Sequence, residues 1–357
     1  MVQPAPKAAP SAGAAWFGGV LADDVLEVSS DPTALDRGGF WAVVVTFEGE
    51  VRLWRLGRCR AAPAPPGDPR GWQGPGAGTW TSSLGRDAYR AGVQEVRRRI
   101  REGDVYQANL CRVLRAPVAP EVDVWALAAR LAAGNPAPYA AVLDLPAGPD
   151  GTGVPATQVV CASPELFLAR DGDTVTSSPI KGTSTTAAGL SVKDEAENVM
   201  IVDLVRNDLQ RVCRPGTVDV PALLAVEEHP GLVHLVSTVR GSLVTGTGWP
   251  QLLAALAPPG SVSGAPKISA LGVIAGLEPV PRGPYCGAIG WVDTDRRRAR
   301  LAVGIRTFWR DGGDLCFGTG AGITWGSDPD AEWAETELKA RRLVRLASSH
   351  EPPGSPA

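Results

Sequence analysis

Three stretches of the chain carry apolar residues at the spacing of an amphipathic helix. The first begins near Tyr89 and is stopped by Gly103. The second covers residues 191–213 and the third covers residues 327–347. We expect Asp328 to cap the third helix, because a proline follows it in the first turn.

Shorter stretches have the alternating or continuous apolar pattern of β-strands. They cover residues 41–56, 104–114, 157–170, 231–244, 285–293, 299–310 and 314–325. Most follow one another like successive hairpins, which is typical of antiparallel sheets rather than βαβ repeats. In the second stretch, Gln107, Asn109 and Cys111 share one face. We therefore predict an α+β fold built on large antiparallel sheets.

Proline and glycine mark the boundary of the main body. Residues 61–78 are rich in both and are typical of a linker. A chain of 357 residues is long enough to bury a large core in one or two domains. We expect a disordered tail at 1–15, a short region of strands and linker at 16–80, the main body at 81–347 and a C-terminal tail at 348–357.

Composition narrows the class of protein. Hydrophobic residues make up 44% and charged residues 20% of the chain, and the formal net charge is -3. These values are ordinary for a globular protein and give no reason to expect a nucleic-acid surface. The sequence has neither the apolar core of a secretory signal nor an apolar run long enough for a membrane span. The six cysteines are scattered, which indicates reduced thiols, a cytoplasmic location and no zinc site.

Two pairs of acidic residues stand near predicted helix N-termini. Asp194 and Glu197 are three positions apart, as are Glu332 and Glu335, so each pair shares a helix face. The helix macrodipole alone favours acidic residues there. Two such pairs on separate helices also suit a hard cation such as Mg²⁺, which takes oxygen ligands from a few carboxylates. From the residues alone, both interpretations stay open.

Other polar groups also allow two interpretations. Lys181, in the stretch SSPIKGTSTT, is either part of a polar turn or an amine that becomes nucleophilic when it loses hydration. His234 alternates with apolar neighbours and is either a buried core imidazole or a catalytic group. The glycine-dense stretches 257–267 and 318–329 match neither a P-loop nor a dinucleotide site. They are ordinary turns, or they present backbone N–H groups to an anion.

Ten short motifs occur in a fixed order along residues 80–345. They are GDVYQANL, SPELFL, PIKGT, KDEAENVMIVDLVRNDL, VHLVSTVRG, GSVSGAPK, GPYCGAIG, GIRT, GAGI and SDPDAEWAETELKA. Together they resemble the chorismate-utilising enzymes, the family that contains the large subunit of anthranilate synthase and aminodeoxychorismate synthase component I. The resemblance implies an α/β sandwich of two large antiparallel sheets with helices on the outside, and chorismate bound together with Mg²⁺.

The resemblance also implies roles for individual residues of this chain. Glu197 and Glu335 match direct Mg²⁺ ligands, supported by Asp194 and Glu332. Glu165 matches the general acid or base. Substrate binding is implied for Arg306 and Tyr285 at the enolpyruvyl carboxylate, for the backbone at Gly320 and Gly322, and for Lys339, Ser261, Lys267 and Thr183.

Lys181 and Gln107 bear on the choice among members of this family. Members resembling anthranilate synthase usually carry alanine in place of Lys181. Those resembling aminodeoxychorismate synthase carry a lysine that attacks ring C2 before ammonia enters at C4. Relatives that add water place a lysine base where this chain has Gln107, which speaks against isochorismate or salicylate synthesis.

The resemblance therefore favours an aminodeoxychorismate synthase component I that serves 4-aminobenzoate and folate synthesis. The alternative is an anthranilate synthase component I, in which His234 would assist pyruvate elimination. Because the chain shows no amidotransferase domain, we expect a glutamine amidotransferase partner to supply ammonia. A non-catalytic scaffold is a third possibility, and the retained Lys181 and Arg306 speak against it.

Overall fold

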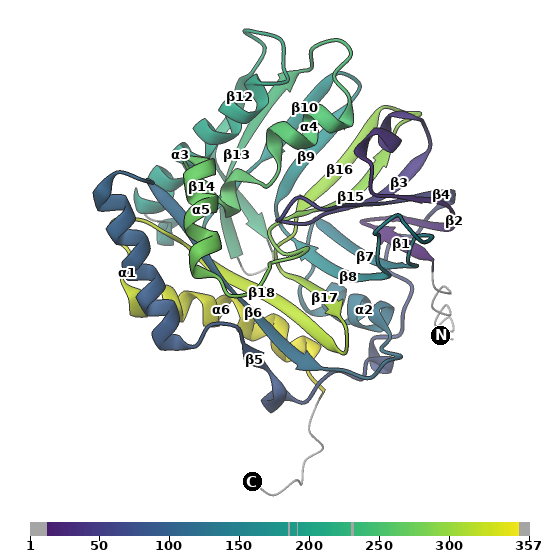
Figure 1. Cartoon of the computed structure of the whole chain (residues 1–357), viewed down its shortest axis with the longest axis horizontal. Coiled ribbons are helices and arrows are strands. Elements are labelled where there is room, and N and C mark those ends of the chain that lie inside the picture. The colour runs from purple at the N-terminus through teal and green to yellow at the C-terminus, as the bar shows by residue number, and fades with distance from the viewer. Residues whose placement is uncertain (1–12, 185, 191, 230–231, 350–357) are drawn as a thin grey trace, which may run out of the picture.

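Antiparallel strands form most of the molecule. The computed structural model describes residues 13–184, 186–190, 192–229 and 232–349 (Figure 1). Within those residues the strands are β1 Ala14–Phe17, β2 Val20–Ser29, β3 Phe40–Val45, β4 Val51–Ala61, β5 Thr81–Ser82, β6 Gln107–Pro117, β7 Tyr139–Leu145, β8 Thr157–Ser163, β9 Leu166–Asp171, β10 Thr174–Ser178, β11 Ile180–Ser184, β12 Asp219–His229, β13 Leu232–Ser242, β14 Gly264–Ala265, β15 Ala288–Asp293, β16 Arg298–Val303, β17 Thr307–Asp311 and β18 Asp314–Ile323. The helices are α1 Arg86–Glu102, α2 Val124–Gly134, α3 Val192–Gln210, α4 Trp249–Leu256, α5 Lys267–Leu277 and α6 Pro329–Ala347.

The strand pairings join into one curled antiparallel ladder. From one edge to the other its order is β14, β6, β18, β17, β8, β7, β1, β2, β4, β3, β15, β16, β9, β10, β13 and β12. The short strand β5 also pairs with β6, and β11 also pairs with β13. The α+β prediction with large antiparallel sheets and helices outside is confirmed. The N-terminal strands β1, β2 and β4 connect the two halves of the ladder.

The long helices form where the apolar stripes predicted them. The buried face of α1 includes Tyr89, Val93 and Val96. This helix ends at Gly103, whose positive φ of 85° lets its N–H close the last turn. Asp328 accepts hydrogen bonds from two backbone N–H groups in the first turn of α6, as the sequence predicted.

Three hydrophobic cores attach the helices to the ladder. The largest lies among β3, β9, β15, β16, α3 and α4. A second packs α2 and α6 against β7, β8, β17 and β18, and a third packs α1 and α5 against β6 and β18. Figure 1 shows α1, α5 and α6 grouped around β6 and β18, with α3 beside β13. No described helix combines the length and apolar character that a membrane crossing requires.

The predicted boundaries at the two ends compare with the structure as follows. Strand β1 begins at Ala14, inside the region 1–15 that was expected to be a tail. Residues 1–12 and 350–357 lie outside the described part of the chain. The predicted linker at 61–78 runs between β4 and β5 and contains short 3-10 turns. The strands before this linker pair directly with β7 and β15 of the main body, so they share its ladder.

Candidate active site

Lys181 lies in β11, which pairs with β13 of the ladder and packs against helix α3. Its backbone is paired with Leu235 of β13. The next residue, Gly182, has a φ of 77°, and a Cβ added there would lie 2.8 Å from the Cβ of Asp194 on α3. Glycine therefore lets β11 turn and lie directly against α3. This close approach carries Lys181 towards the acidic first turns of that helix.

The amine of Lys181 is surrounded by charged groups from several elements. Burial lowers its pKa, and the charges of Glu197, Glu165 and Glu335 oppose that shift. Lys339 is also close enough to lower the pKa further. No hydrogen bond or ion pair of the Lys181 amine occurs within the described residues. A desolvated amine of this kind is more readily deprotonated, which is the condition for a nucleophilic lysine.

Glu165 lies at the turn between β8 and β9 and is only 4% exposed. Burial raises its pKa to about 7, while a hydrogen bond from Ser261 and the positive charge of Lys181 act in the opposite direction. The backbone N–H of Val303 donates to the Glu165 carbonyl (3.0 Å), which fixes the turn. A carboxyl group with this pKa exchanges protons readily at neutral pH, as a general acid or base must.

The four predicted metal-binding carboxylates lie on two helices. Asp194 and Glu197 are in the first turns of α3, which packs against β11 and β13. Glu332, buried at 4% exposure, and Glu335 are in the first turns of α6, which packs against β18. The Lys339 ammonium forms an ion pair with Glu335 at 2.6 Å. Since Glu197 and Glu335 both act on the charge of Lys181, the two helices bring acidic groups to one region.

These carboxylates fit a cation that keeps other ligands besides protein. Among the residues described, no three histidine, cysteine, aspartate or glutamate side chains are close enough to hold a metal ion by themselves. Mg²⁺ usually binds one or two carboxylates and keeps waters or substrate oxygens in its other positions. If a Mg²⁺ ion binds here, Glu197 and Glu335 would be its protein ligands, and substrate and water would complete its coordination.

Arg306 supplies an uncompensated positive charge. It lies between β16 and β17 with a φ of 52°, a left-handed conformation that is uncommon for a residue with a side chain. Its carbonyl accepts a hydrogen bond from the N–H of Ala162 (3.1 Å), which holds this turn in place. Its guanidinium has no hydrogen bond or ion pair within the described residues, and burial lowers its pKa. Such a group is suited to binding a carboxylate.

Tyr285 is buried against β18. A Cβ added at Gly318 of β18 would lie 2.1 Å from the Tyr285 ring, so this glycine makes room for the aromatic side chain. Burial raises the pKa of Tyr285 well above its usual value. The phenol therefore stays protonated and remains a hydrogen-bond donor.

Gly320 and Gly322 of β18 lie opposite two residues of the neighbouring strand β6. The N–H groups of the opposite residues, Cys111 and Asn109, donate to acceptors on the far side of β6. In an antiparallel pair the N–H groups of Gly320 and Gly322 then also point away from β6. The amine of Lys339 donates to the carbonyl of Gly320 at 3.1 Å. This edge of β18 therefore presents backbone N–H groups next to a cation.

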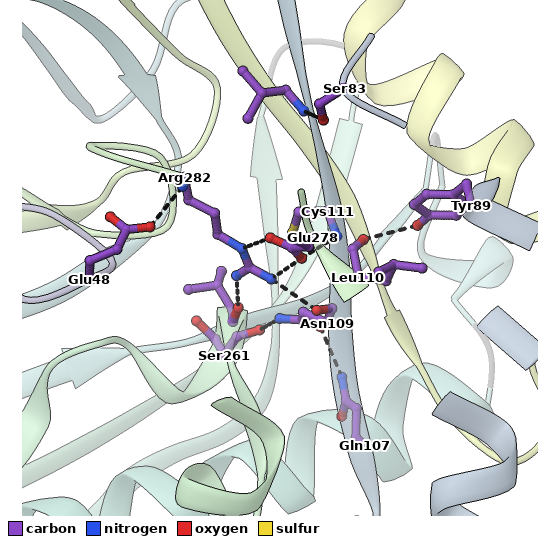
Figure 2. Close-up of polar contacts among 12 residues, drawn as sticks. Glu48, Ser83, Tyr89, Gln107, Asn109, Leu110, Cys111, Ser261, Glu278 and Arg282 are labelled. Carbon is purple, nitrogen blue, oxygen red and sulfur yellow. Dashed lines mark hydrogen bonds and ion pairs between the residues drawn. The ribbon is translucent and has the colours of Figure 1, made fainter. Parts of the chain in front are cut away.

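Gln107 has a buried acceptor without a partner. Its side chain is completely buried, and its Nε2 donates weakly to Asn109 Oδ1 at 3.4 Å, as Figure 2 shows. Its Oε1 has no hydrogen-bond partner among the residues that the structure describes. A Cβ on Gly322 would lie 2.3 Å from Gln107 Nε2, so the glycine leaves space for this amide. An unpaired buried carbonyl is costly and indicates a missing donor.

The remaining predicted residues take different positions. Ser261 donates to Glu165, whereas the Lys267 amine pairs with Asp208 at 2.6 Å. Glu165, Ser261 and Asp208 all line a small cavity of about 20 Å³. His234 is 2% exposed in β13. Its backbone lies opposite Thr183, whose side chain is outside what the structure describes.

One part of the site has no counterpart among the predicted residues. The buried guanidinium of Arg282 pairs with Glu278 at 2.6 Å and donates to the carbonyls of Val262 and Asn109, both at 2.9 Å. Glu278 in turn accepts from the N–H of Cys111 at 2.8 Å. Figure 2 shows this network beside Gln107 and Ser261. It fixes the loop before α5 against the part of β6 that contains Asn109 and Cys111.

Comparison with known proteins places the chain among chorismate enzymes. The family described as chorismate binding enzyme matches residues 68–345. Anthranilate synthase component 1 of Streptomyces coelicolor is 39% identical over 314 residues, covering 82% of this chain and 59% of the relative. Aminodeoxychorismate synthase component 1 of Escherichia coli is 36% identical over 278 residues, covering 74% of this chain and 59% of the relative.

Solved structures share the fold. Anthranilate synthase component I from Streptococcus pneumoniae superposes with a TM-score of 0.77 at 22% identity, covering 96% of this chain and 95% of that one. The chain spans a little over half the length of the curated relatives it matches. The matched family covers more than half of the chain and includes every candidate site residue. The chain therefore belongs to the chorismate binding enzyme family.

Proposed function

We propose that this protein aminates chorismate at C4 and forms 4-amino-4-deoxychorismate, as an aminodeoxychorismate synthase component I. One observation carries this choice within the family. Lys181, an amine with a lowered pKa, lies close to the charge of Glu165, whose pKa is raised to about 7. A nucleophilic amine beside a proton donor is what displacement of a ring hydroxyl requires.

Substrate binding follows from the charges of the site. Chorismate carries two carboxylates. The uncompensated guanidinium of Arg306 would hold the enolpyruvyl carboxylate, with the protonated phenol of Tyr285 as a further donor. Glu197 and Glu335 would hold Mg²⁺ at the ring carboxylate, with Asp194 and Glu332 in support. When bound, this ion would neutralise the ring carboxylate and stabilise the charge that shifts during the reaction.

The amination proceeds in two displacements. The neutral amine of Lys181 forms a bond to ring C2, both ring double bonds shift by one position, and the bond between C4 and its hydroxyl oxygen breaks. Glu165 donates the proton that lets this hydroxyl leave as water. Ammonia then forms a bond to C4, both double bonds shift back, and the bond between C2 and the Lys181 nitrogen breaks. Protons released from the two nitrogens return through Glu165.

The side chain of Gln107 supports ammonia, rather than water, as the final nucleophile. Its Oε1 is buried and lacks a donor, and ammonia has N–H groups to offer. An amide cannot act as a base towards water, so Gln107 would bind the nucleophile without activating water. This property favours amination over hydration.

Ammonia itself would come from a partner. The names of the relatives designate a component 1, so a second component is expected for them. We propose a glutamine amidotransferase subunit in that role. The isolated chain should then accept ammonium but not glutamine.

The alternative function within the family is that of an anthranilate synthase component I. Relatives with this name are as similar as those that aminate at C4, at 39% against 36% identity. In that case amination at C2 would be followed by loss of pyruvate, with buried His234 as the assisting group. The lysine at position 181 favours C4 amination, because the covalent step needs this amine.

A product assay distinguishes these possibilities. The isolated chain would be incubated with chorismate, Mg²⁺ and either ammonium or glutamine. With ammonium we expect a product that yields 4-aminobenzoate only after a lyase is added, and with glutamine we expect none. Fluorescent anthranilate would establish the alternative, and turnover of glutamine by the chain alone would refute the proposed partner. Binding of chorismate without turnover would indicate a scaffold.

A further inference from the structure

A second and larger cavity lies at the end of β9 that is remote from Glu165. Its volume is about 200 Å³. Three arginines, Arg170, Arg297 and Arg298, line it, and the buried side chains of Trp249 and Val292 form part of its wall. Arg170 is roughly 16 Å along the strand from the catalytic carboxyl, given the rise of a β-strand per residue. The cavity is therefore separate from the candidate active site.

Two hairpins of the ladder allow a direct comparison for Arg170. The β9–β10 turn has the sequence Arg170, Asp171, Gly172, and the β17–β18 turn has the same three residue types beginning at Arg310. In both, the arginine Nε donates to the glycine carbonyl at 3.0 Å. Both glycines have nearly the same φ, 60° and 59°. The two turns therefore have the same backbone conformation, and the Nε of each arginine makes the same hydrogen bond.

The two arginines differ at their terminal nitrogens. Nη1 of Arg310 donates to the carbonyl of Pro120 and to Gln158 Oε1. The terminal nitrogens of Arg170 have no acceptor and no carboxylate partner within the residues described. The guanidinium of Arg170 lies instead over the ring of Trp249, 5.9 Å from its centroid, at the wall of the cavity. Its donors are therefore available to a ligand in the cavity.

The other arginines of the cavity are already paired. Arg297 forms an ion pair with Asp173, and Arg298 lies 3.6 Å from Asp171. Burial and the charge of Arg297 lower the pKa of Arg170. Arg170 is thus the cation of this cavity whose charge no carboxylate neutralises directly.

The charges of Asp173 and Asp36 oppose the lowering of the Arg170 pKa, but neither carboxylate forms an ion pair with Arg170 within the described residues. Asp36 accepts a hydrogen bond from the N–H of Trp249 (3.1 Å) and caps the start of α4. Asp293 pairs with Arg296 at 2.7 Å. Both carboxylates already bind groups other than Arg170. The guanidinium of Arg170 is therefore available to bind an added anion in the cavity.

We propose that this cavity binds a ring-sized organic carboxylate, with the carboxylate on the fork of Arg170 and the ring against Trp249 and Val292. A cavity of about 150 Å³ accommodates benzene, so the observed volume leaves room for a ring and one carboxylate. Trp249 and Val292 give the otherwise polar wall one apolar part, against which a ring can pack. This site is independent of the proposed catalytic function.

A fluorine NMR titration of the full chain with 4-fluorobenzoate tests the proposal. We expect saturable binding that excess chorismate does not displace. Arg170→Gln should weaken it by about tenfold to a hundredfold, which is the range for loss of a hydrogen bond to a charged group. Arg310→Gln is the matched control, because it removes the same side chain from the equivalent hairpin, and binding should stay within about twofold.

Two further measurements keep the test decisive. The neutral probe 4-fluorobenzamide should bind at least about tenfold more weakly than the carboxylate. If Arg170→Gln fails to fold, Arg170→Lys keeps the charge without the fork and should still weaken binding several-fold. Absence of saturable binding, displacement by chorismate, equal binding of the amide, or unchanged affinity in the Arg170 variants would overturn the proposal.

Discussion

At the scale of the residue, burial acts in opposite directions on Glu165 and Lys181. It raises the pKa of the carboxyl to about 7 and lowers the pKa of the amine. Burial disfavours the charged form of each group, so it favours a neutral acid next to a neutral base. That is the protonation state in which Lys181 can attack while Glu165 donates a proton.

Replacement of Glu165 tests whether this carboxyl group is the proton donor. The wild-type rate should fall as pH rises above about 7, because Glu165 then loses the proton it must donate. Glu165→Gln should lower kcat by about 10²- to 10⁴-fold, the usual contribution of a general acid, and should abolish the alkaline decline. A pH–rate profile of ammonium-dependent turnover measures both effects. An unchanged alkaline limb in the variant would show that another group titrates.

The same variant has an effect on stability with a definite sign. The folded chain holds the Glu165 proton up to pH about 7, whereas the unfolded chain loses it near its ordinary pKa. The free energy of unfolding therefore decreases between those two pH values as pH rises. Glu165→Gln should remove this decrease, so that the variant gains stability relative to wild type above pH 7.

At the scale of the element, a buried ion pair holds the site together. Arg282 and Glu278 are 1% and 6% exposed, and they join β6, the loop before α5 and the segment leading to Tyr285. The ring of Phe47 stacks on the guanidinium at 4.1 Å, and Glu48 accepts from the N–H of Arg282. The pair thus links the segment after β3 to the part of β6 that contains Asn109 and Cys111.

Loss of one partner should cost more than loss of both. Arg282→Met leaves a buried carboxylate uncompensated and should lower the free energy of unfolding by about 3–5 kcal/mol. The double variant with Glu278→Leu should recover part of that loss, as measured by urea denaturation. Arg206→Met, which breaks an exposed pair with Asp203, should change stability by less than about 1 kcal/mol. Equal stability of the Arg282 single variant and wild type would contradict a structural role for the pair.

Local patterns predicted some of these elements and missed others. Helices α1, α3 and α6 have long stripes and recognisable ends, so their positions were predicted closely. Helix α5 begins after a glycine- and proline-rich stretch that resembles a loop, and its apolar residues give no clear stripe. Strand β12 was also missed, because its pattern is interrupted where it slips against β13.

The site shows the same limit of local patterns. The shared face of Gln107 and Asn109 was predicted from alternation, and the structure places both there. Arg282 was not predicted, because EPVPR resembles a turn and its partners Val262 and Asn109 are distant in sequence. The role of Gly322 in leaving space for Gln107 also depends on pairing between β6 and β18. Such contacts between distant segments follow only from the assembled ladder.

At the scale of the whole molecule, the ladder brings acidic residues of helices α3 and α6 close to Lys181. Strand β11 holds Lys181 against α3, and α6 packs against β18. Acidic groups from both helices act on the one amine between them. Because these elements lie far apart in the sequence, the chemistry of Lys181 depends on closure of the complete fold.

The central claim is that the Lys181 amine forms a bond to the substrate ring. Peptide mass mapping after rapid mixing of the chain with chorismate and Mg²⁺, without ammonium, tests it directly. We predict that the peptide with Lys181 gains the mass of chorismate less one water, and that ammonium removes this adduct while product forms. An unmodified Lys181 in a preparation that turns over chorismate with ammonium would contradict the account.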